Sequence, residues 1–372
     1  MKILLLGEYS NVHATLAEGL RALGHHVVVA SNGDFWKNYP RDIDLSRTYS
    51  HLGGLRLMFK LATLLPRFRG FDIVQLINPM FVELKAQHIR PLYNYLRRHN
   101  RRIVLGAYGM DYYWVNVCST QKPLAYSDFN IGNQLRTDPD AQRERTDWIG
   151  TPKEKLNQLI AHDCDHIITA LYEYDVCYRP YFPHKTTFIP LPINIEKATA
   201  DQTQPYPSND TQRIKIFLGI NKTRSTYKGT DVMLRAARRI EKEYADRVEL
   251  RIAESVPYEQ YQQLMNGADL ILDQLYSYTP SMNPLLAMAK GIVCVGGGEE
   301  ENYQIINEHQ LRPSINVKPN EESVYQALKA IVEHPEQLPL LKQQSQQYVA
   351  KHHHHLKVAQ QYEKVYQKLL QE

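Results

Sequence analysis

Basic side chains gather in one loop of the second half of the chain, where an apolar segment ends and a helical pattern begins. Asn221, Lys222, Arg224 and Lys228 follow Gly219 closely in the sequence. A guanidinium group can grip two oxygens of one anion, whereas a lysine supplies a point charge. The first amides of a helix also attract negative charge. This loop therefore predicts a binding site for a pyrophosphate group, with a solvated surface loop as the alternative.

A second loop that precedes a helical pattern carries Tyr278, Ser281, Met282 and Asn283. The unpaired amides and the dipole of such a helix favour an anion at its beginning. We expect these residues to line the same anion site from a second side.

Glycines stand at the ends of two predicted strands. Gly7 follows the first strand, and Gly297 and Gly298 belong to a run of glycines after a later one. A glycine lets the backbone approach a ligand closely because it has no side chain. We expect these glycines to contact the bound group, and a plain turn is the alternative for the glycine run.

The elements that must position these residues are short apolar strands, which alternate with helical stretches. We expect strands at residues 2–6, 26–30, 71–77, 102–105, 166–169, 186–189, 213–218, 247–253, 268–273, 292–295 and 314–317. We expect helices at residues 11–23, 85–99, 152–162, 230–244, 258–266, 283–290, 322–333 and 335–370. Apolar strands joined by helices indicate parallel sheets that are covered on both faces. Ligands of such sheets lie outside the carboxyl ends of the strands.

A polar stretch with two prolines, residues 196–212, separates two such series of strands and helices. It predicts a first domain at residues 1–195 and a second at 213–345, with 196–212 as the linker and 346–372 as a terminal helix. The expected architecture is two doubly wound, Rossmann-like α/β domains that face a cleft.

The composition is that of a globular chain. The 372 residues are 43% hydrophobic and 23% charged, and no apolar run approaches the ~20 residues that a membrane span needs. The four cysteines are scattered, which argues against a disulfide scaffold and favours a cytoplasmic protein. The net charge of +4 comes from the first 195 residues. No nucleic-acid module accompanies that charge, so nucleic acid is not an expected partner.

Two groups of basic residues account for much of the positive charge in the first half. They are Arg97, Arg98, Arg101 and Arg102 in one group, and Lys60, Arg67 and Arg69 in the other. A solvated helix end is one interpretation. The other is peripheral contact with an anionic membrane, on its cytoplasmic face.

The motifs together resemble those of a known family. Residues 217–234 and 284–298 resemble the donor domain of glycosyltransferases with the GT-B fold, and most of all the retaining family four (glycosyl transferases group 1). Residues 162–169 and 187–194 resemble the end of that family's acceptor domain, and residues 106–111 resemble its His-Gly-x-Asp segment. The resemblance covers nearly the whole chain.

The resemblance implies transfer of a sugar from a nucleoside-diphosphate sugar to a glycan or lipid-linked acceptor, as in polysaccharide biosynthesis. It implies retention of configuration, no metal ion and no cofactor besides the nucleotide-sugar co-substrate. Asp111, Arg224 and Lys228 are then the expected catalytic residues. The resemblance also implies that residues 346–372 cross back to the first domain.

The chain departs from the family at three positions. The two glutamates that usually flank the donor loop fall on Tyr278 and Leu286, and the usual histidine falls on Tyr108. A catalytically degenerate protein that binds a glycan or a partner is therefore an alternative, and so is a sugar-nucleotide epimerase. A nicotinamide-dependent oxidoreductase is disfavoured because no G-x-G-x-x-G follows the first strand.

Three short motifs contain potential metal ligands. They are 138–140 (Asp-Pro-Asp), 163–165 (Asp-Cys-Asp) and the histidine run 352–355. Neither aspartate motif has the context of a metal-dependent transferase. Successive residues of a helical histidine run face different directions. We therefore expect no metal site.

Overall fold

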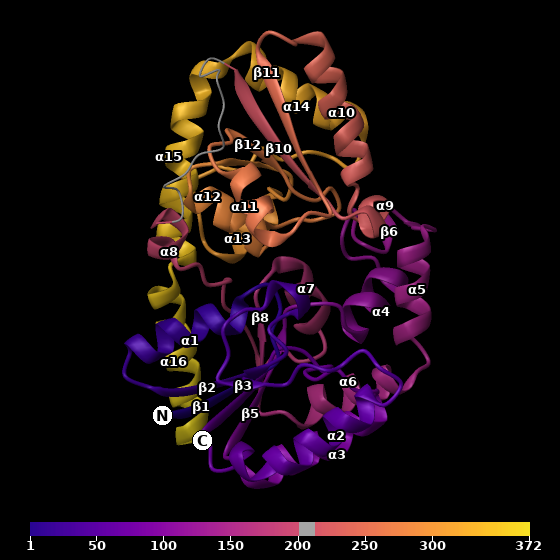
Figure 1. Ribbon diagram of the computed structural model, residues 1–372, viewed down its shortest axis with the longest axis vertical. Helices are drawn as coiled ribbons and strands as arrows, with labels where there is room; N and C mark the ends of the chain where they lie inside the picture. The colour runs from indigo at the N-terminus through magenta and orange to yellow at the C-terminus, as the bar shows by residue number, and fades with distance from the viewer. Residues whose placement is uncertain (201–212) are drawn as a thin grey trace. The chain divides into compact units, whose positions relative to one another are not determined.

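The computed structural model describes residues 1–200 and 213–372, apart from the side chain of Tyr258. Parallel strands alternate with helices along the chain (Figure 1). The fold class predicted from the sequence, two Rossmann-like α/β domains, is confirmed.

The chain forms two compact units, each assembled from separate parts of the sequence. Unit 1 consists of Met1–Gln121, Glu144–Pro192 and His355–Glu372. Unit 2 consists of Lys122–Arg143 and Ile193–His354. The first half of the sequence thus contributes an internal segment, residues 122–143, to unit 2.

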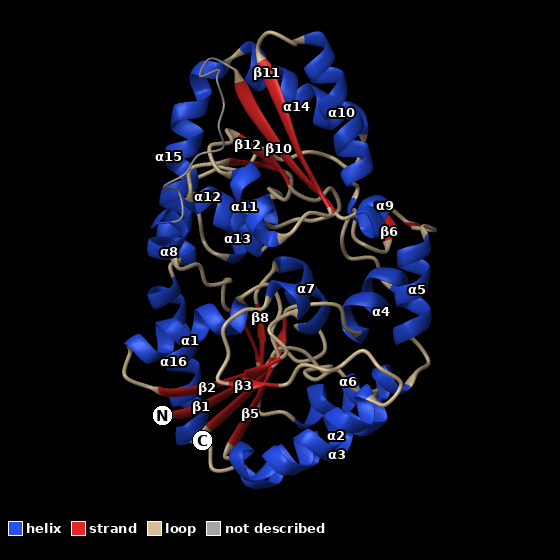
Figure 2. Cartoon of the chain, in the orientation of Figure 1, coloured by secondary structure: helices blue, strands red, loops and turns tan. Residues whose placement is uncertain are grey.

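Unit 1 contains a parallel sheet in the order β3-β2-β1-β4-β5-β8-β9. Its strands are β1 (Lys2–Leu6), β2 (His26–Ser31), β3 (Ile43–Asp44), β4 (Ile73–Leu76), β5 (Arg102–Ala107), β8 (His166–Thr169) and β9 (Thr186–Phe188). Its helices are α1 (Val12–Ala22), α2 (Gly53–Leu64), α3 (Ala86–His99), α4 (Tyr112–Thr120), α6 (Pro152–Asp163), α7 (Tyr172–Tyr178) and α16 (His355–Gln371). The helices make the crossovers that parallel strands require (Figure 2).

The last helix of the chain, α16, packs beside the first helix, α1 (Figure 1). A side chain at Gly19 of α1 would lie 2.6 Å from the carbonyl oxygen of His355 and 2.7 Å from Cβ of Ala359. Glycine is therefore what allows the two helices to approach so closely. Val358, Tyr362, Tyr366 and Leu369 of α16 share a buried core with strand residues of unit 1.

Unit 2 contains a second parallel sheet, in the order β11-β10-β12-β13. Its strands are β10 (Ile214–Ile220), β11 (Val248–Glu254), β12 (Leu270–Leu272) and β13 (Val293–Val295). Its helices are α8 (Ile195–Ala200), α9 (Ser225–Lys228), α10 (Thr230–Glu243), α11 (Tyr258–Met265), α12 (Met282–Ala289), α13 (Glu300–Ile305), α14 (Glu321–Glu333) and α15 (Leu338–Tyr348). An antiparallel hairpin, β6 (Asn130–Ile131) and β7 (Gln134–Leu135), comes from the internal segment, and α5 (Pro139–Trp148) runs on from unit 2 into unit 1.

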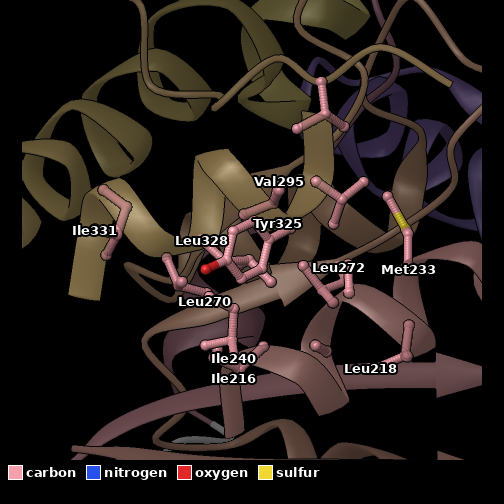
Figure 3. Packing of buried hydrophobic residues seen from close by; sticks show 14 of the residues in the cluster. Ile216, Leu218, Met233, Ile240, Leu270, Leu272, Val295, Tyr325, Leu328 and Ile331 are labelled. Carbon is pink, nitrogen blue, oxygen red and sulfur yellow. The ribbon is translucent and has the colours of Figure 1, made fainter. Parts of the chain in front are cut away.

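The core of unit 2 forms where α10 and α14 pack on this sheet (Figure 3). Met233 and Ile240 of α10, and Leu328 and Ile331 of α14, recur at helical spacing, so each helix presents one apolar face to the strands. These side chains meet buried strand residues such as Leu218 and Leu272.

The terminal stretch predicted as one helix, residues 335–370, is divided. A π-helix (Val349–His353) follows α15, and His354 leaves the helical conformation before α16 begins. His354 instead pairs with Ile193 in an isolated parallel bridge. The predicted strand at 314–317 is likewise reduced to a bridge between Ile315 and Val295.

Only the first residues of the predicted linker, 196–212, belong to the described part of the chain. These residues belong to α8, and residues 201–212 lie outside the described part of the chain.

Candidate functional site

The loops that follow β10, β12 and β13 lie at the same edge of the sheet of unit 2, because the strands are parallel neighbours. Two of these loops are joined by a hydrogen bond, in which the amide of Leu275 donates to the carbonyl oxygen of Lys228 at 2.9 Å. Another joins the amide of Glu299 to the carbonyl oxygen of Tyr278 at 3.2 Å. The two loops singled out by the sequence and the glycine run are therefore neighbours.

The first loop begins with a turn that Asn221 caps. Its side-chain oxygen accepts a hydrogen bond from the amide of Thr223 at 3.1 Å. Lys222 is exposed and its Nζ lies 3.4 Å from a carboxylate oxygen of Glu254. Lys222 therefore points to solvent and to the end of β11.

Arg224 lies with its guanidinium carbon 4.8 Å from the ring centre of Tyr227. Its Nε is buried and has no hydrogen-bond partner among the residues that the structure describes. A buried donor without a partner is costly, so this nitrogen is available to an anionic ligand.

Lys228 lies close to Asp273, which follows β12. Burial raises the pKa of the Asp273 carboxyl, while the charge of Lys228 and a hydrogen bond from Asn283 oppose that rise. Asn283 also donates a hydrogen bond to the hydroxyl of Tyr261 at 2.8 Å. A side chain at Gly219 would lie 2.6 Å from the Tyr261 ring, so glycine is required there by packing. The structure thus brings Gly219, Lys228 and Asn283 together around Asp273.

The second loop leads into α12. Ser281 is the residue before this helix, and its side chain makes no capping hydrogen bond. Met282 is buried in the first turn. Tyr278 is also buried, and its hydroxyl accepts a hydrogen bond from the amide of Ala125 at 2.8 Å. Tyr278 therefore fastens the internal segment 122–143 to this loop.

The glycine run packs closely against the second loop. Gly297 has a φ of +51°, and a side chain there would lie 3.0 Å from the Thr279 backbone. The Gly298 amide donates to the Asn316 side chain at 3.3 Å, and the Gly296 amide donates to the Ile315 carbonyl oxygen at 3.0 Å. These two amides are therefore already engaged inside the protein.

A buried arginine of the internal segment completes this region of unit 2. Nη2 of Arg136 donates to the carbonyl oxygen of Thr226 at 2.9 Å, in the turn between Arg224 and Lys228. The same guanidinium group lies over the ring of Tyr276 and forms an ion pair with Asp138 at 3.2 Å.

Asp111 belongs to unit 1 and is fully buried. One carboxylate oxygen accepts the amide of Trp114 at 2.9 Å and so caps α4, and the other accepts the hydroxyl of Tyr178 at 2.8 Å. Burial raises the pKa of Asp111 to about 7, although these hydrogen bonds favour the ionised form.

Gly7 also lies in unit 1, where a side chain would lie 2.2 Å from a methyl carbon of Ile77. The next residue, Glu8, is buried, and its carboxylate accepts the first amides of α1, from His13 at 3.2 Å and from Ala14 at 2.8 Å. The carboxyl group of Glu8 thus takes the place that a phosphate would have at this helix.

The three motifs with potential metal ligands have other partners. Asp138 pairs with Arg136, and Asp165 pairs with Arg97 and Arg102. In the histidine run, His352 bonds to Glu308 at 2.5 Å, and His354 bonds to Glu196 at 3.1 Å. Around this run, ligand atoms of Glu196, His354 and His355 lie within 4.8 Å of one another, a grouping that could hold a metal ion.

The sequence analysis missed Asp273, Tyr261, Arg136 and Glu8. Asp273 and Glu8 carried a usable signal, because each stands at the carboxyl end of a predicted strand. Arg136 and Tyr261 carried none, since their contacts join segments that are far apart in the sequence.

No family model matches the sequence, and no curated protein matches it. Solved structures do match. Sucrose-phosphate synthase from Thermosynechococcus elongatus superimposes with a TM-score of 0.62 at 16% identity, over 99% of both chains. The chain has the GT-B fold.

Two further solved structures support the same GT-B fold. HepE from Anabaena, in complex with UDP and glucose, matches with a TM-score of 0.60 at 12% identity, over 98% of this chain and 99% of that one. A protein from Listeria monocytogenes assigned as a UDP-N-acetylglucosamine 2-epimerase matches with a TM-score of 0.56 at 12% identity, over 97% and 94%. Within this GT-B fold, Gly7 and Asp111 belong to unit 1 and the other predicted site residues to unit 2.

Proposed function

We propose that this protein transfers a sugar from a nucleoside-diphosphate sugar to a hydroxyl group of a glycan or lipid-linked acceptor, with retention and without a metal ion. The bond between the anomeric carbon and the phosphate oxygen breaks, and its electron pair stays on the phosphate. The acceptor oxygen bonds to the same carbon, and its proton passes to the departing phosphate. This route needs no carboxylate nucleophile, which agrees with Tyr278 and Leu286 at the positions of the family's glutamates.

The observation that carries the proposal is the pair of cationic side chains at the carboxyl edge of the sheet of unit 2, in a chain with the GT-B fold. Arg224 has a buried nitrogen that makes no hydrogen bond within the described residues, and Lys228 lies beside Asp273. Charge develops on the diphosphate as it leaves, so preorganised cations stabilise the transition state. Removing one such group typically lowers the rate by about 10²–10³.

Asp111 is proposed to act through its neighbours. Because its carboxylate is buried and holds both the beginning of α4 and the Tyr178 hydroxyl, its contribution is to position this part of unit 1 for the acceptor. We expect Asp111→Asn to lower activity through both this geometry and stability.

The donor proposal is tested by thermal unfolding in the presence of a panel of nucleoside diphosphates and nucleotide sugars. We expect one donor to raise the melting temperature and Lys228→Ala to remove that rise. Lys242→Ala is the matched control, because it removes an exposed lysine at the far end of α10. No rise with any member of the panel would contradict the proposal.

A sugar-nucleotide epimerase is the second candidate, favoured by the match to the Listeria protein. The two candidates differ in what happens without an acceptor. An epimerase converts the donor sugar, whereas a transferase leaves it intact until an acceptor is added. Nuclear magnetic resonance of the products distinguishes these outcomes and reports the anomeric configuration. A separate assay in EDTA tests the metal requirement, and unchanged activity there would support metal independence. Donor binding without turnover would favour a degenerate binding protein.

A further inference from the structure

Large apolar side chains are exposed in one stretch of unit 1. Among the described residues, this stretch holds most of the exposed large apolar side chains, which are between 37% and 77% exposed. They are Phe35, Trp36, Tyr49, Leu52, Leu55, Met58 and Phe59. Such a concentration marks a surface that contacts something apolar.

Helix α2 is apolar on two opposite faces. Leu57 and Leu61 are buried and hold the helix on unit 1. Leu55, Met58 and Phe59 lie on the other face at helical spacing and are exposed, and Leu55 and Phe59 are 64% and 74% exposed. A helix of a water-exposed surface normally carries polar residues on its outer face, so this face requires another explanation.

Cationic side chains border this outer face. Arg56 lies within α2 beside it, and Arg67 and Arg69 follow the helix closely. All three are exposed, and none has an acidic partner within the described residues, whereas Lys60 is paired with Asp44. Residues 35–70 contain seven basic and two acidic residues, so the net charge of this stretch, +5, exceeds the net charge of the whole chain, +4.

The other basic group of the first half is different. Arg97 and Arg102 both pair with Asp165, and Arg101 pairs with Asp72. Their charge is largely compensated inside unit 1. Three of the four arginines in that group are thus paired, whereas Arg56, Arg67 and Arg69 next to the exposed apolar face of α2 have no ion pair within the described residues.

We propose that the outer face of α2, with Leu55, Met58 and Phe59 between Arg56, Arg67 and Arg69, lies on the surface of an anionic lipid bilayer. Apolar side chains of an interfacial helix enter the region between headgroups and acyl chains, while cations remain at the headgroups. Each basic residue near an anionic surface strengthens binding. Among the described residues, none of the helices is long and apolar enough to cross a membrane, which is compatible with contact from one side.

Charge decides between a bilayer and a second copy of the chain. In a two-fold dimer the same surface meets itself, so the positive residues around α2 would face one another. An anionic bilayer attracts those residues and covers the apolar face at the same time. This inference does not depend on the donor proposal, because binding to a bilayer needs no nucleotide sugar.

The test uses the full chain and sedimentation with vesicles. We expect binding to vesicles of phosphatidylcholine mixed with phosphatidylglycerol, weak binding to phosphatidylcholine alone, and release by salt. Phe59→Glu should weaken binding at least tenfold, and Arg67→Ala with Arg69→Ala should weaken it about 30-fold, given about 1 kcal/mol, or about fivefold, for each charge. Leu340→Glu is the matched control, since Leu340 is 59% exposed on α15 of unit 2.

A tryptophan at position 59, in the Phe59→Trp variant, reports whether the helix enters the bilayer. We expect its emission to shift to the blue with anionic vesicles and to become protected from iodide. Circular dichroism checks that each variant is folded. Absence of binding to anionic vesicles, or binding that Phe59→Glu leaves unchanged, would overturn the proposal. So would a concentration-dependent dimer in sedimentation velocity that Phe59→Glu abolishes, because the face would then be a protein interface.

Discussion

The guanidinium carbon of Arg136 lies 3.6 Å from the centre of the Tyr276 ring, and both residues are in unit 2. Tyr276 follows β12, whereas Arg136 belongs to the internal segment from the first half of the sequence. Since Arg136 also holds the carbonyl oxygen of Thr226, it fastens residues 122–143 to the loop that carries Arg224 and Lys228.

Arg136→Met is predicted to destabilise unit 2 and to loosen the internal segment. The substitution leaves the carboxylate of Asp138, whose side chain is only 8% exposed, without its ion-pair partner, and breaking a buried ion pair in this way costs about 3–5 kcal/mol. Hydrogen exchange followed by mass spectrometry should show faster exchange in residues 122–143 and 224–229 than in the wild-type protein.

The double variant Arg136→Met with Asp138→Asn is the control for this prediction. Asparagine keeps the side-chain oxygen that accepts the Ala141 amide but removes the unpaired charge. We expect it to recover a substantial part of the lost stability in scanning calorimetry. Equal stability of the single and double variants would show that the charge pair contributes little.

The sequence predicted elements well where one physical signal was strong. The apolar strands and the helix stop at Gly24 matched β1, α1 and β2 within one or two residues. Helix α2 was missed; it begins with two glycines, and apolar residues lie on its outer face as well as on its buried one. Helix α4 contains aromatic and β-branched residues that favour strands, and its helical state depends on the cap by Asp111 and on packing.

The candidate site was predictable to the level of its loops. The strand ends and basic residues indicated the loops around Lys228 and Asn283, which the structure places next to each other around Asp273. The contribution of Arg136 depends on long-range contact, which no local pattern encodes. The sequence also did not predict the break in the terminal helix at His354, because residues 335–370 have a helical pattern on both sides of it. The roles of these site residues in binding and catalysis stay predictions.

The contribution of Glu8 to the stability of unit 1 is predicted to fall as the pH rises from about 5 to about 8. Burial raises the pKa of Glu8 to about 8 from its ordinary value of 4.5, so the folded state binds a proton that the unfolded chain releases in this range. Below its pKa in the unfolded chain, Glu8 therefore does not lower the free energy of unfolding. Above that pKa it lowers this free energy increasingly, until the pH reaches its pKa in the folded state. Glu8→Gln should remove this part of the pH dependence, which is on the order of a few kcal/mol.

Urea unfolding at several pH values measures this effect through tryptophan fluorescence. Trp36, Trp114 and Trp148 all belong to unit 1, so their emission reports on that unit. Glu18→Gln, in the same α1 helix, should leave the slope of stability against pH as it is in the wild-type protein. If Glu8→Gln showed the same slope as the wild-type protein, the protonation of Glu8 would not be its cause.

The terminal helix α16 is predicted to be an integral part of unit 1. The hydroxyl of Tyr366 donates to the Gln75 side-chain oxygen at 2.5 Å within the core. Tyr366→Phe leaves that oxygen unpaired and should lower the free energy of unfolding by about 1–3 kcal/mol. Tyr181→Phe is the matched control, because Tyr181 is 45% exposed and water can replace its bond to Gln121. Deleting residues 355–372 should abolish the cooperative tryptophan transition, and a truncated chain that retained the wild-type transition would show that α16 is dispensable.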